Sequence, residues 1–244
     1  MTLEEAYALL GGDVREAAAR LGSRALLIKY LRQFPEDGGM AALRAARVAR
    51  DEAALWQAAH ALRGASGALG LREVAEAAGQ CMAAPEAAWA DLERAYDRAV
   101  AVIGLVEDED TGDAPHGVVF EGLRALLVED DRLCAEMTAA MLAGLGIRVH
   151  ATQDSDEAVR LANRGGFDCV FLDAHMPGTD IVATLKDIHA ALPGAPVFVL
   201  TAGLRPCEEE WLRGAGMRAC LGKPPDAKAV SGLLVACFPD IKNR

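Results

Sequence analysis

Five short apolar segments recur in the second half of this 244-residue chain, and each gap between them has the pattern of a helix. The segments read RALLV, IRVHA, DCVFL, PVFVL and RACLG, and they begin at Arg124, Ile147, Asp168, Pro196 and Arg218. Apolar runs of this length are typical of strands in a buried parallel sheet, whose crossovers are helices. We therefore predict a doubly wound five-stranded parallel sheet in the order 2-1-3-4-5, with helices on both faces.

The first half contains no β-rich segment. Residues 1–106 carry apolar residues at helical spacing almost throughout, which predicts an antiparallel helical bundle. The stretch EDEDTGDAPHG (107–117) is acidic, holds Gly and Pro and lacks periodicity, as linkers do. The predicted fold class is thus α plus α/β, with a helical bundle at 1–106, an acidic linker at 107–119 and the sheet at 120–244.

Composition excludes several classes of partner. A formal net charge of −11 argues against nucleic-acid binding, which needs clustered Lys and Arg. The chain begins with an acidic amphipathic stretch rather than a secretion signal, and it has no apolar run of about 18 residues. Its six cysteines show no C-x-x-C spacing, which favours buried thiols over a zinc or disulfide framework. We expect a cytoplasmic protein with neither a membrane nor a nucleic acid as partner.

Reactive side chains follow four of the predicted strands. Glu129 and Asp130 end the first strand, Asp173 the third, Thr201 the fourth and Lys223 the fifth. A single acidic strand end is more often a helix cap, but four matched strand ends at one sheet edge indicate a site. Clustered carboxylates repel unless a cation intervenes, and their oxygens suit Mg²⁺. Together with a lysine and a hydroxyl they fit phosphoryl transfer, with Asp173 as the nucleophile.

From residue 120 to about 240 the chain resembles a response-regulator receiver domain at every main motif. The resemblance implies that Asp173 is the phosphoacceptor, that Glu129 and Asp130 bind Mg²⁺ with it, and that the backbone carbonyl of His175 is a further metal ligand. It also implies that Thr201 and Lys223 contact the phosphoryl group. One departure is Cys220, which stands where the family usually has an aromatic residue that couples phosphorylation to the output face.

A second candidate site lies in the first half, in the stretch AHALRGASGALG (59–70). On a helix over 55–69 an apolar stripe forms on one side, and His60 lies nearly opposite it. Gly64 and Gly67 follow on the side of His60, and Arg63 is one turn away. A surface histidine beside chance glycines is the simpler interpretation. The alternative is a phosphorylatable imidazole that must enter a partner's crevice, for which bare backbone leaves room.

The same stretch resembles the signature of histidine phosphotransfer (HPt) domains, with Arg63 in place of the usual lysine. The phosphoacceptor helix of histidine kinases is the competing resemblance. It fits at His60, Leu62 and Arg63 but not at the following three residues, and the kinases' ATP-binding motifs do not occur in the sequence. We therefore expect no phosphorylation from ATP, so the chain is not predicted to be an enzyme, apart from loss of phosphate by the receiver itself.

Together the two resemblances imply a two-component phosphorelay protein with phosphoryl groups on His60 and Asp173 and with Mg²⁺ as its cofactor. Its partners would be a sensor histidine kinase or that kinase's receiver domain, and other receiver or HPt proteins, with no small-molecule substrate beyond phosphodonors. Two alternatives stay open. The receiver could control a binding partner through its surface, or it could drain phosphate from a pathway, with His60 unused in either case.

Overall fold

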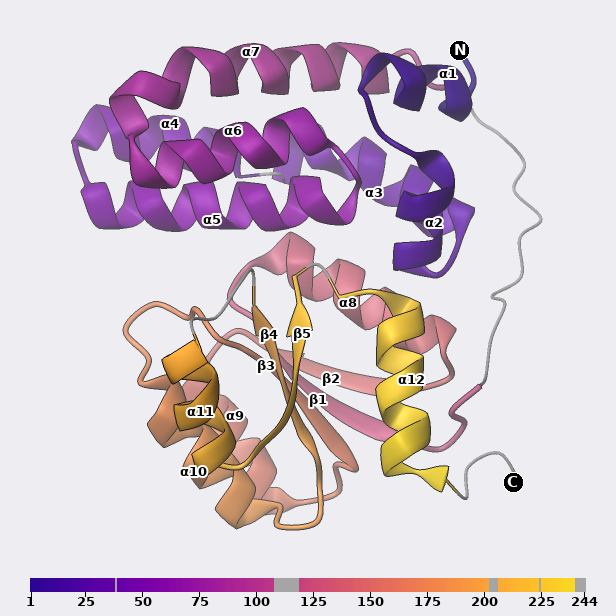
Figure 1. Ribbon diagram of the computed structural model, residues 1–244, viewed down its shortest axis with the longest axis vertical. Coiled ribbons are helices and arrows are strands. Elements are labelled where there is room, and N and C mark those ends of the chain that lie inside the picture. Colours follow the sequence, from indigo (N-terminus) through magenta and orange to yellow (C-terminus); the bar gives the residue numbers. More distant parts are fainter. Residues whose placement is uncertain (38, 108–118, 202–205, 224, 240–244) are drawn as a thin grey trace. The chain divides into compact units, whose positions relative to one another are not determined.

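The computed structural model describes residues 1–37, 39–107, 119–201, 206–223 and 225–239 (Figure 1). The chain divides into two compact units, Met1–Ala114 and Pro115–Arg244, and each is described by itself. Apart from its first and last residues, the predicted linker at 107–119 lies outside the described residues. The structure confirms the predicted fold class, with helices in the first unit and a five-stranded parallel sheet in the second.

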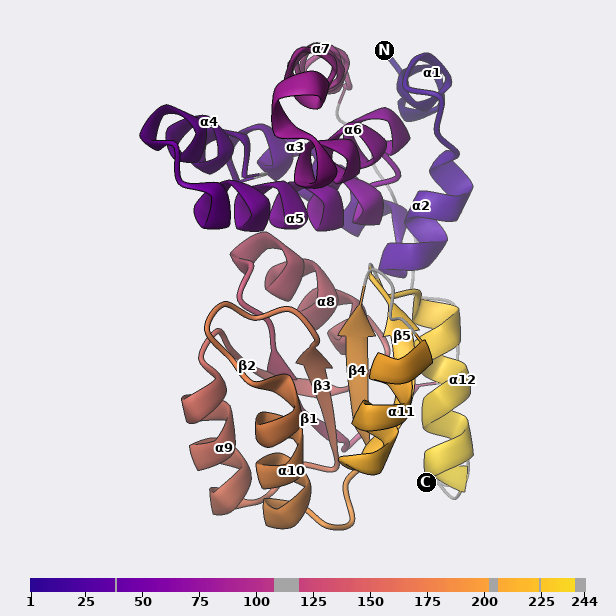
Figure 2. The same cartoon turned by 60° about the vertical axis from the view of Figure 1, so that its left-hand side comes forward.

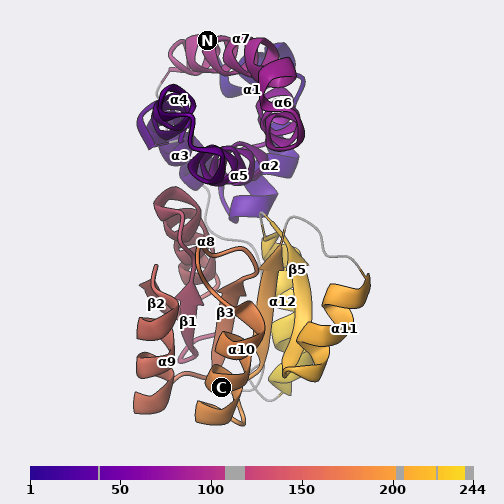
Figure 3. The same ribbon diagram turned by 90° about the vertical axis from the view of Figure 1, so that its left-hand side faces the viewer.

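The described part of the first unit is helical. Its helices are α1 (Leu3–Leu9), α2 (Val14–Leu21), α3 (Arg24–Asp37), α4 (Met40–Ala49), α5 (Glu52–Ala68), α6 (Arg72–Ala83) and α7 (Pro85–Ile103). Helix α5 packs between α4 and α6, and α6 packs against α7 (Figure 2 and Figure 3). Pro85 occupies the first turn of α7, where its missing N–H costs nothing. Fully buried side chains such as Tyr30, Phe34 and Leu62 fill the interior.

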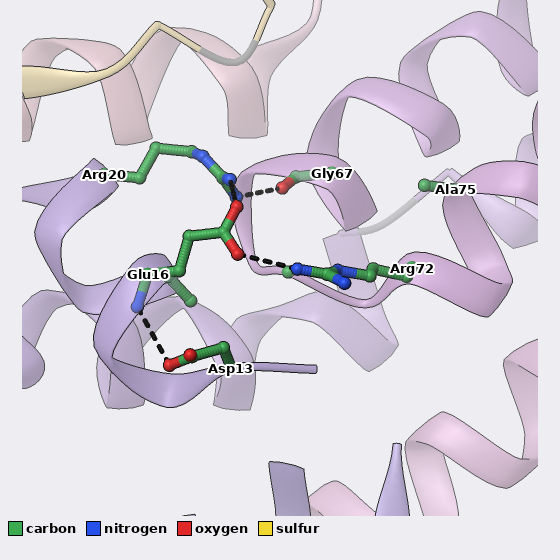
Figure 4. A pocket seen from close by; sticks show the side chains of 8 residues that line it. Asp13, Glu16, Arg20, Gly67, Arg72 and Ala75 are labelled. Atoms are coloured by element: carbon green, nitrogen blue, oxygen red, sulfur yellow. Dashed lines mark hydrogen bonds and ion pairs between the residues drawn. The ribbon is translucent and has the colours of Figure 1, made fainter. Parts of the chain in front are cut away.

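Helices α1 and α2 attach to the C-terminal end of α5. The hydroxyl of Tyr7 donates a hydrogen bond to the carbonyl of Leu69, and Arg20 Nη1 donates to the carbonyl of Gly67 at 2.8 Å. The carboxylate of Glu16 bridges Arg20 and Arg72, at 2.7 Å to each (Figure 4). The carbonyl groups of Gly67 and Leu69 lie at the C-terminal end of α5, where carbonyl oxygens no longer meet the N–H group four residues on and can accept from side chains.

The second unit is built on the strands β1 (Arg124–Val128), β2 (Arg148–Thr152), β3 (Cys169–Asp173), β4 (Val197–Thr201) and β5 (Met217–Gly222). All adjacent strands pair in parallel, and their order is β2-β1-β3-β4-β5, as predicted. The connecting helices are α8 (Arg132–Gly144), α9 (Ser155–Arg164), α10 (Ile181–Ala191), α11 (Pro206–Gly214) and α12 (Ala227–Cys237).

Two apolar clusters, one on each face of the sheet, fix these helices. Helices α8 and α12 pack on one face around Phe171 and Phe198, and α9, α10 and α11 pack on the other around Leu172 and Val199 (Figure 2). Aspartates cap the first turns of α8, α9, α10 and α12. The register pairs Val128 with Leu172 and Thr201 with Gly222, so the carboxyl ends of the strands lie along one edge.

Candidate functional site

Three carboxylates meet at the carboxyl edge of the sheet. Glu129 and Asp130 directly follow β1, and Asp173 is the last residue of the neighbouring strand β3. One carboxylate oxygen from each lies within 4.8 Å of the others. The next residue, Asp131, does serve as a helix cap, because its carboxylate accepts a hydrogen bond from the N–H of Cys134 at 2.7 Å. Capping therefore accounts for one of the three consecutive acidic residues and leaves Glu129 and Asp130 for the cluster.

Lys223 joins two of the three carboxylates. Its Nζ lies 2.6 Å from Glu129 Oε2 and 2.7 Å from Asp173 Oδ2. All three side chains are buried, and that of Asp173 has no exposed surface. Buried ions are costly unless they are paired, and here one ammonium group faces more than one carboxylate.

The local charge balance perturbs every group in the cluster. Burial raises the pKa of Glu129, and the nearby charge of Asp173 raises it further, while Lys223 opposes both effects. Burial and Asp173 raise the pKa of Asp130 to about 6. Burial lowers the pKa of Lys223, but the charges of Glu129 and Asp173 outweigh this effect and hold its pKa above the usual range. The cluster thus carries an excess of negative charge that one lysine does not neutralise.

Backbone groups hold the remaining predicted residues at the same edge. The N–H of His175 donates to Asp173 Oδ1 at 3.0 Å, so the loop after β3 fixes the carboxylate. The N–H of Lys223 donates to the carbonyl of Thr201 at 2.7 Å, and Thr201 is a buried residue at the end of β4. The structure therefore gathers Glu129, Asp130, Asp173, Thr201 and Lys223 along one edge, with His175 beside them.

The donor set of the cluster fits a hard divalent cation. It offers carboxylate oxygens from three residues within a few ångströms, with neither sulfur nor imidazole in the set. Oxygen ligands of this kind suit Mg²⁺. A cation would also relieve the repulsion that raises the pKa values of Glu129 and Asp130. The acidic cluster is consistent with a magnesium site.

His60 lies in the first unit, near the middle of α5. The five apolar residues predicted to face the core are buried: Leu55, Ala58, Leu62, Ala65 and Leu69. His60 is half-buried, as are Gly64 and Gly67 on the same side of the helix. The side chain of Arg63 extends across α6, since a Cβ added at Gly79 would lie 3.5 Å from its Cδ.

The sequence analysis did not single out one neighbour of His60. Trp56 lies one helical turn before His60 on α5, and 38% of its surface is exposed. Its indole stacks on the imidazole of His60, with ring centroids 5.2 Å apart and an interplanar angle of 11°. The available signal was the spacing of four residues, which places two side chains on one helix face.

Comparison with known families matches both units. The model of the response regulator receiver domain matches residues 125–233, and that of the Hpt domain matches residues 25–107. The chain carries an Hpt domain followed by a response regulator receiver domain. This pair of domains makes it a two-component phosphorelay protein, and no kinase domain is among the family matches.

Several known proteins resemble part of this phosphorelay chain. Sensor histidine kinase AruS of Pseudomonas aeruginosa is 33% identical over 118 residues, which are 47% of this chain and 12% of the kinase. Response regulator receiver protein Anae109_2439 of Anaeromyxobacter sp. is 36% identical over 104 residues, 41% of this chain and 42% of that protein. The chain thus spans less than half the length of these relatives.

Similar solved structures cover about half of the chain. The receiver domain of sensor histidine kinase PA1611 from P. aeruginosa PAO1 is 31% identical, with a TM-score of 0.45, over 48% of this chain and 98% of that domain. Chemotaxis protein CheY4 of Vibrio cholerae is 22% identical, with a TM-score of 0.45, over 47% of this chain and 98% of CheY4.

Two smaller expectations concern membranes and cysteines. Among the described residues, none of the helices combines the length and the apolar character needed to cross a bilayer. The cysteines whose side chains the structure describes, Cys81, Cys134, Cys169, Cys220 and Cys237, are all free thiols. Cys220 is half-buried on β5, and it packs against the apolar cluster beneath α9, α10 and α11.

Proposed function

We propose that this chain is a relay intermediate that carries phosphoryl groups on His60 and on Asp173, with Mg²⁺ required at Asp173. The observation that carries the proposal is the buried cluster in which Glu129, Asp130 and Asp173 meet Lys223 at one sheet edge. Its partners are a sensor histidine kinase or the receiver domain of one, and other receiver or Hpt proteins. We place the protein in the cytoplasm, where such kinases present their phosphoryl groups.

At the receiver, Asp173 attacks the phosphorus atom of a phosphohistidine on the partner. The Asp173 O–P bond forms as the N–P bond breaks, and its electron pair stays on the leaving imidazole. The side chains of Glu129, Asp130 and Asp173 and the backbone carbonyl of His175 would hold Mg²⁺. When bound, the ion neutralises charge on the carboxylates and on the transferred phosphoryl group.

The other two residues at the edge act on the phosphoryl oxygens. Lys223 already lies 2.7 Å from Asp173, so a modest movement of its ammonium group pairs it with an oxygen of the phosphorylated side chain. The hydroxyl of Thr201, at the end of the adjacent strand, donates to a second oxygen. Both contacts strengthen as charge gathers on these oxygens, and this difference from the ground state is what lowers the barrier.

His60 takes a phosphoryl group from an aspartyl phosphate. The lone pair of one ring nitrogen attacks phosphorus while the acyl O–P bond breaks, and the electron pair returns to the aspartate carboxylate. The N–H on the other ring nitrogen then loses its proton to water. A neutral imidazole suits this role because an anionic phosphoryl donor does not repel it.

Labelling of the full chain tests the receiver assignment. We expect acetyl phosphate with MgCl₂ to phosphorylate the wild-type chain at Asp173, as an alkali-labile product found by intact-mass measurement. Asp173→Asn should lose this label, and His60→Gln should keep it. Label retained on Asp173→Asn would contradict the assignment. A wild-type acyl phosphate that decays within seconds would favour the phosphate-draining alternative over a relay.

A further inference from the structure

The stacked pair on α5 sets Trp56 apart from the packing residues of the first unit. Trp56 and His60 are one helical turn apart on the same face, so the two rings lie one above the other. A centroid separation of 5.2 Å with an interplanar angle of 11° is an offset parallel stack. Trp89 provides the contrast, because it is buried at 8% exposure and the guanidinium of Arg47 covers its ring.

The stack fixes the plane of the imidazole. The outer torsion of a histidine side chain is soft and broadly two-fold, so an isolated surface imidazole samples many orientations. A flat indole against one face removes most of that freedom. The nitrogen lone pairs lie in the ring plane, so they point past the indole rather than into it. Trp56 therefore contacts a face of the imidazole and not the ring edge that carries its nitrogens.

The stack also changes in strength during the reaction. As the N–P bond forms, the imidazole ring carries positive charge until its other nitrogen loses a proton. An aromatic face attracts a cation more strongly than a neutral ring. The contact is thus stronger in the transition state than before it, and only interactions with this property speed the chemical step.

We propose that Trp56 is a positioning residue for phosphoryl transfer at His60, which holds the imidazole by its face so that a ring nitrogen is presented to the phosphoryl group. This inference rests on the proposed use of His60. It assigns a role that depends on an aromatic ring at position 56, whichever protein supplies the phosphoryl group.

The test uses the full chain carrying Asp173→Asn, so that any label reports the helical unit, and phosphoramidate as a small phosphodonor. The label is measured as acid-labile phosphohistidine by mass spectrometry over a range of donor concentrations. We expect Trp56→Ala to lower the maximal labelling rate about 5- to 10-fold with little change in the half-saturating phosphoramidate concentration. Trp56→Phe should stay within about twofold of the parent, because a phenyl ring can still stack. Gln57→Ala, the neighbouring half-buried position on α5, is the matched control and should label at the parent rate.

Tryptophan fluorescence gives a second measurement. If Trp56 only stabilised the fold, its emission would not change when His60 is phosphorylated. Phosphorylation of His60 alters the charge against the indole, so it should change the tryptophan emission of the parent. The same treatment should leave the emission of Trp56→Phe unchanged. Circular dichroism of each variant reports whether it is folded, and Trp56→Phe keeps the test valid if Trp56→Ala does not fold.

Each outcome decides one question. A folded Trp56→Ala that labels His60 at the parent rate overturns the positioning role and leaves the proposed function standing. A Trp56→Phe that labels as slowly as Trp56→Ala also overturns it, since stacking would not then be the cause. If the parent carries no phosphohistidine label beyond that of the same chain with His60→Gln, the proposed function itself is wrong.

Discussion

At the scale of single residues, the receiver edge is a balance of charges that is incomplete without a cation. Lys223 contacts Glu129 and Asp173, and Asp130 adds a third carboxylate to the cluster. The pKa of Asp130 rises to about 6 because of its burial and the nearby charge of Asp173. A protonated carboxyl and a bound Mg²⁺ are therefore alternative ways to relieve the same repulsion.

This balance predicts how stability depends on pH without Mg²⁺. The pKa of Asp130 is near 3.8 when unfolded and about 6 when folded, so the folded state holds a proton that the unfolded state has lost. The resulting stabilisation is fully present below pH 3.8 and is lost as pH rises through 6. After allowance for solvent screening, we expect Asp130 to contribute a loss of about 1 kcal/mol between pH 4 and pH 7.

Urea unfolding at pH 5, 6 and 7.5, with EDTA or with MgCl₂, measures the effect. Asp130→Asn should flatten the pH dependence in EDTA, and it should weaken the stabilisation by MgCl₂. In the wild type that stabilisation should grow with pH, because the metal no longer competes with protons. If the free energy of unfolding in EDTA changed with pH equally in the wild type and in Asp130→Asn, the raised pKa could not be assigned to Asp130.

The sequence allowed most of the receiver residues to be predicted, because strand ends in a parallel sheet converge by topology alone. It did not reveal that the His175 N–H holds Asp173, since any residue supplies that group. Trp56 was missed for another reason. Periodicity separates buried from exposed faces, and it does not state that an apolar ring on the outer face stacks on a histidine.

At the scale of elements, the five strands end within one residue of their predicted bounds. Buried apolar runs account for this in β1, β3 and β4, whereas β2 is largely exposed and β5 is only partly buried. The start of α9 shows a local contact that the residue pattern alone does not fix. The spacing of Asp154 and Glu157 is that of a capping box, and Asp154 does accept from the N–H of Glu157 at 2.8 Å. In a capping box the Glu157 carboxylate would accept from the N–H of Asp154. Here it accepts from the hydroxyl of Thr152 at 2.5 Å, so a side chain at the end of β2 takes the place of the backbone N–H.

The attachment of α2 to α5 was not predictable either, because its acceptors are backbone carbonyls far along the chain. Arg20 uses one nitrogen for Gly67 and the other for Glu16, and its side chain is only 18% exposed (Figure 4). We expect Arg20→Ala to increase the hydrogen exchange of residues 3–21 about 10-fold, as a charged hydrogen bond is worth about 1.5 kcal/mol. Peptide-level mass spectrometry measures the exchange.

The matched control is Arg94→Ala, which removes an exposed ion pair to Asp91 on one turn of α7. Such pairs contribute little, so exchange in α1 and α2 should not change. Arg20→Lys should restore only part of the protection, because an ammonium group does not reproduce the two-pronged geometry of the guanidinium. If residues 3–21 of Arg20→Ala exchanged their amide hydrogens as slowly as those of the wild type, α1 and α2 would be held by their buried apolar residues alone.

At the scale of the whole molecule, each of the two compact units carries one of the two proposed phosphoryl acceptors, and the two side chains have opposite chemistry. Asp173 is a buried anion among other anions, and it needs a cation before an anionic donor can approach. His60 is an imidazole on a helix whose apolar stripe is already buried. The two sites should therefore respond differently when metal is removed.

We expect EDTA to abolish the labelling of Asp173 and to leave the labelling of His60 by phosphoramidate within about twofold. The full chain serves in two forms, His60→Gln to report Asp173 and Asp173→Asn to report His60, each with MgCl₂ or with EDTA. Alkali-labile and acid-labile phosphate, separated by intact mass after each treatment, give the two yields. Because a neutral imidazole meets no repulsion from the donor, its rate has no electrostatic reason to depend on Mg²⁺. Equal suppression of both labels by EDTA would mean that His60 depends on the metal as well, and the division of chemistry between the units would be wrong.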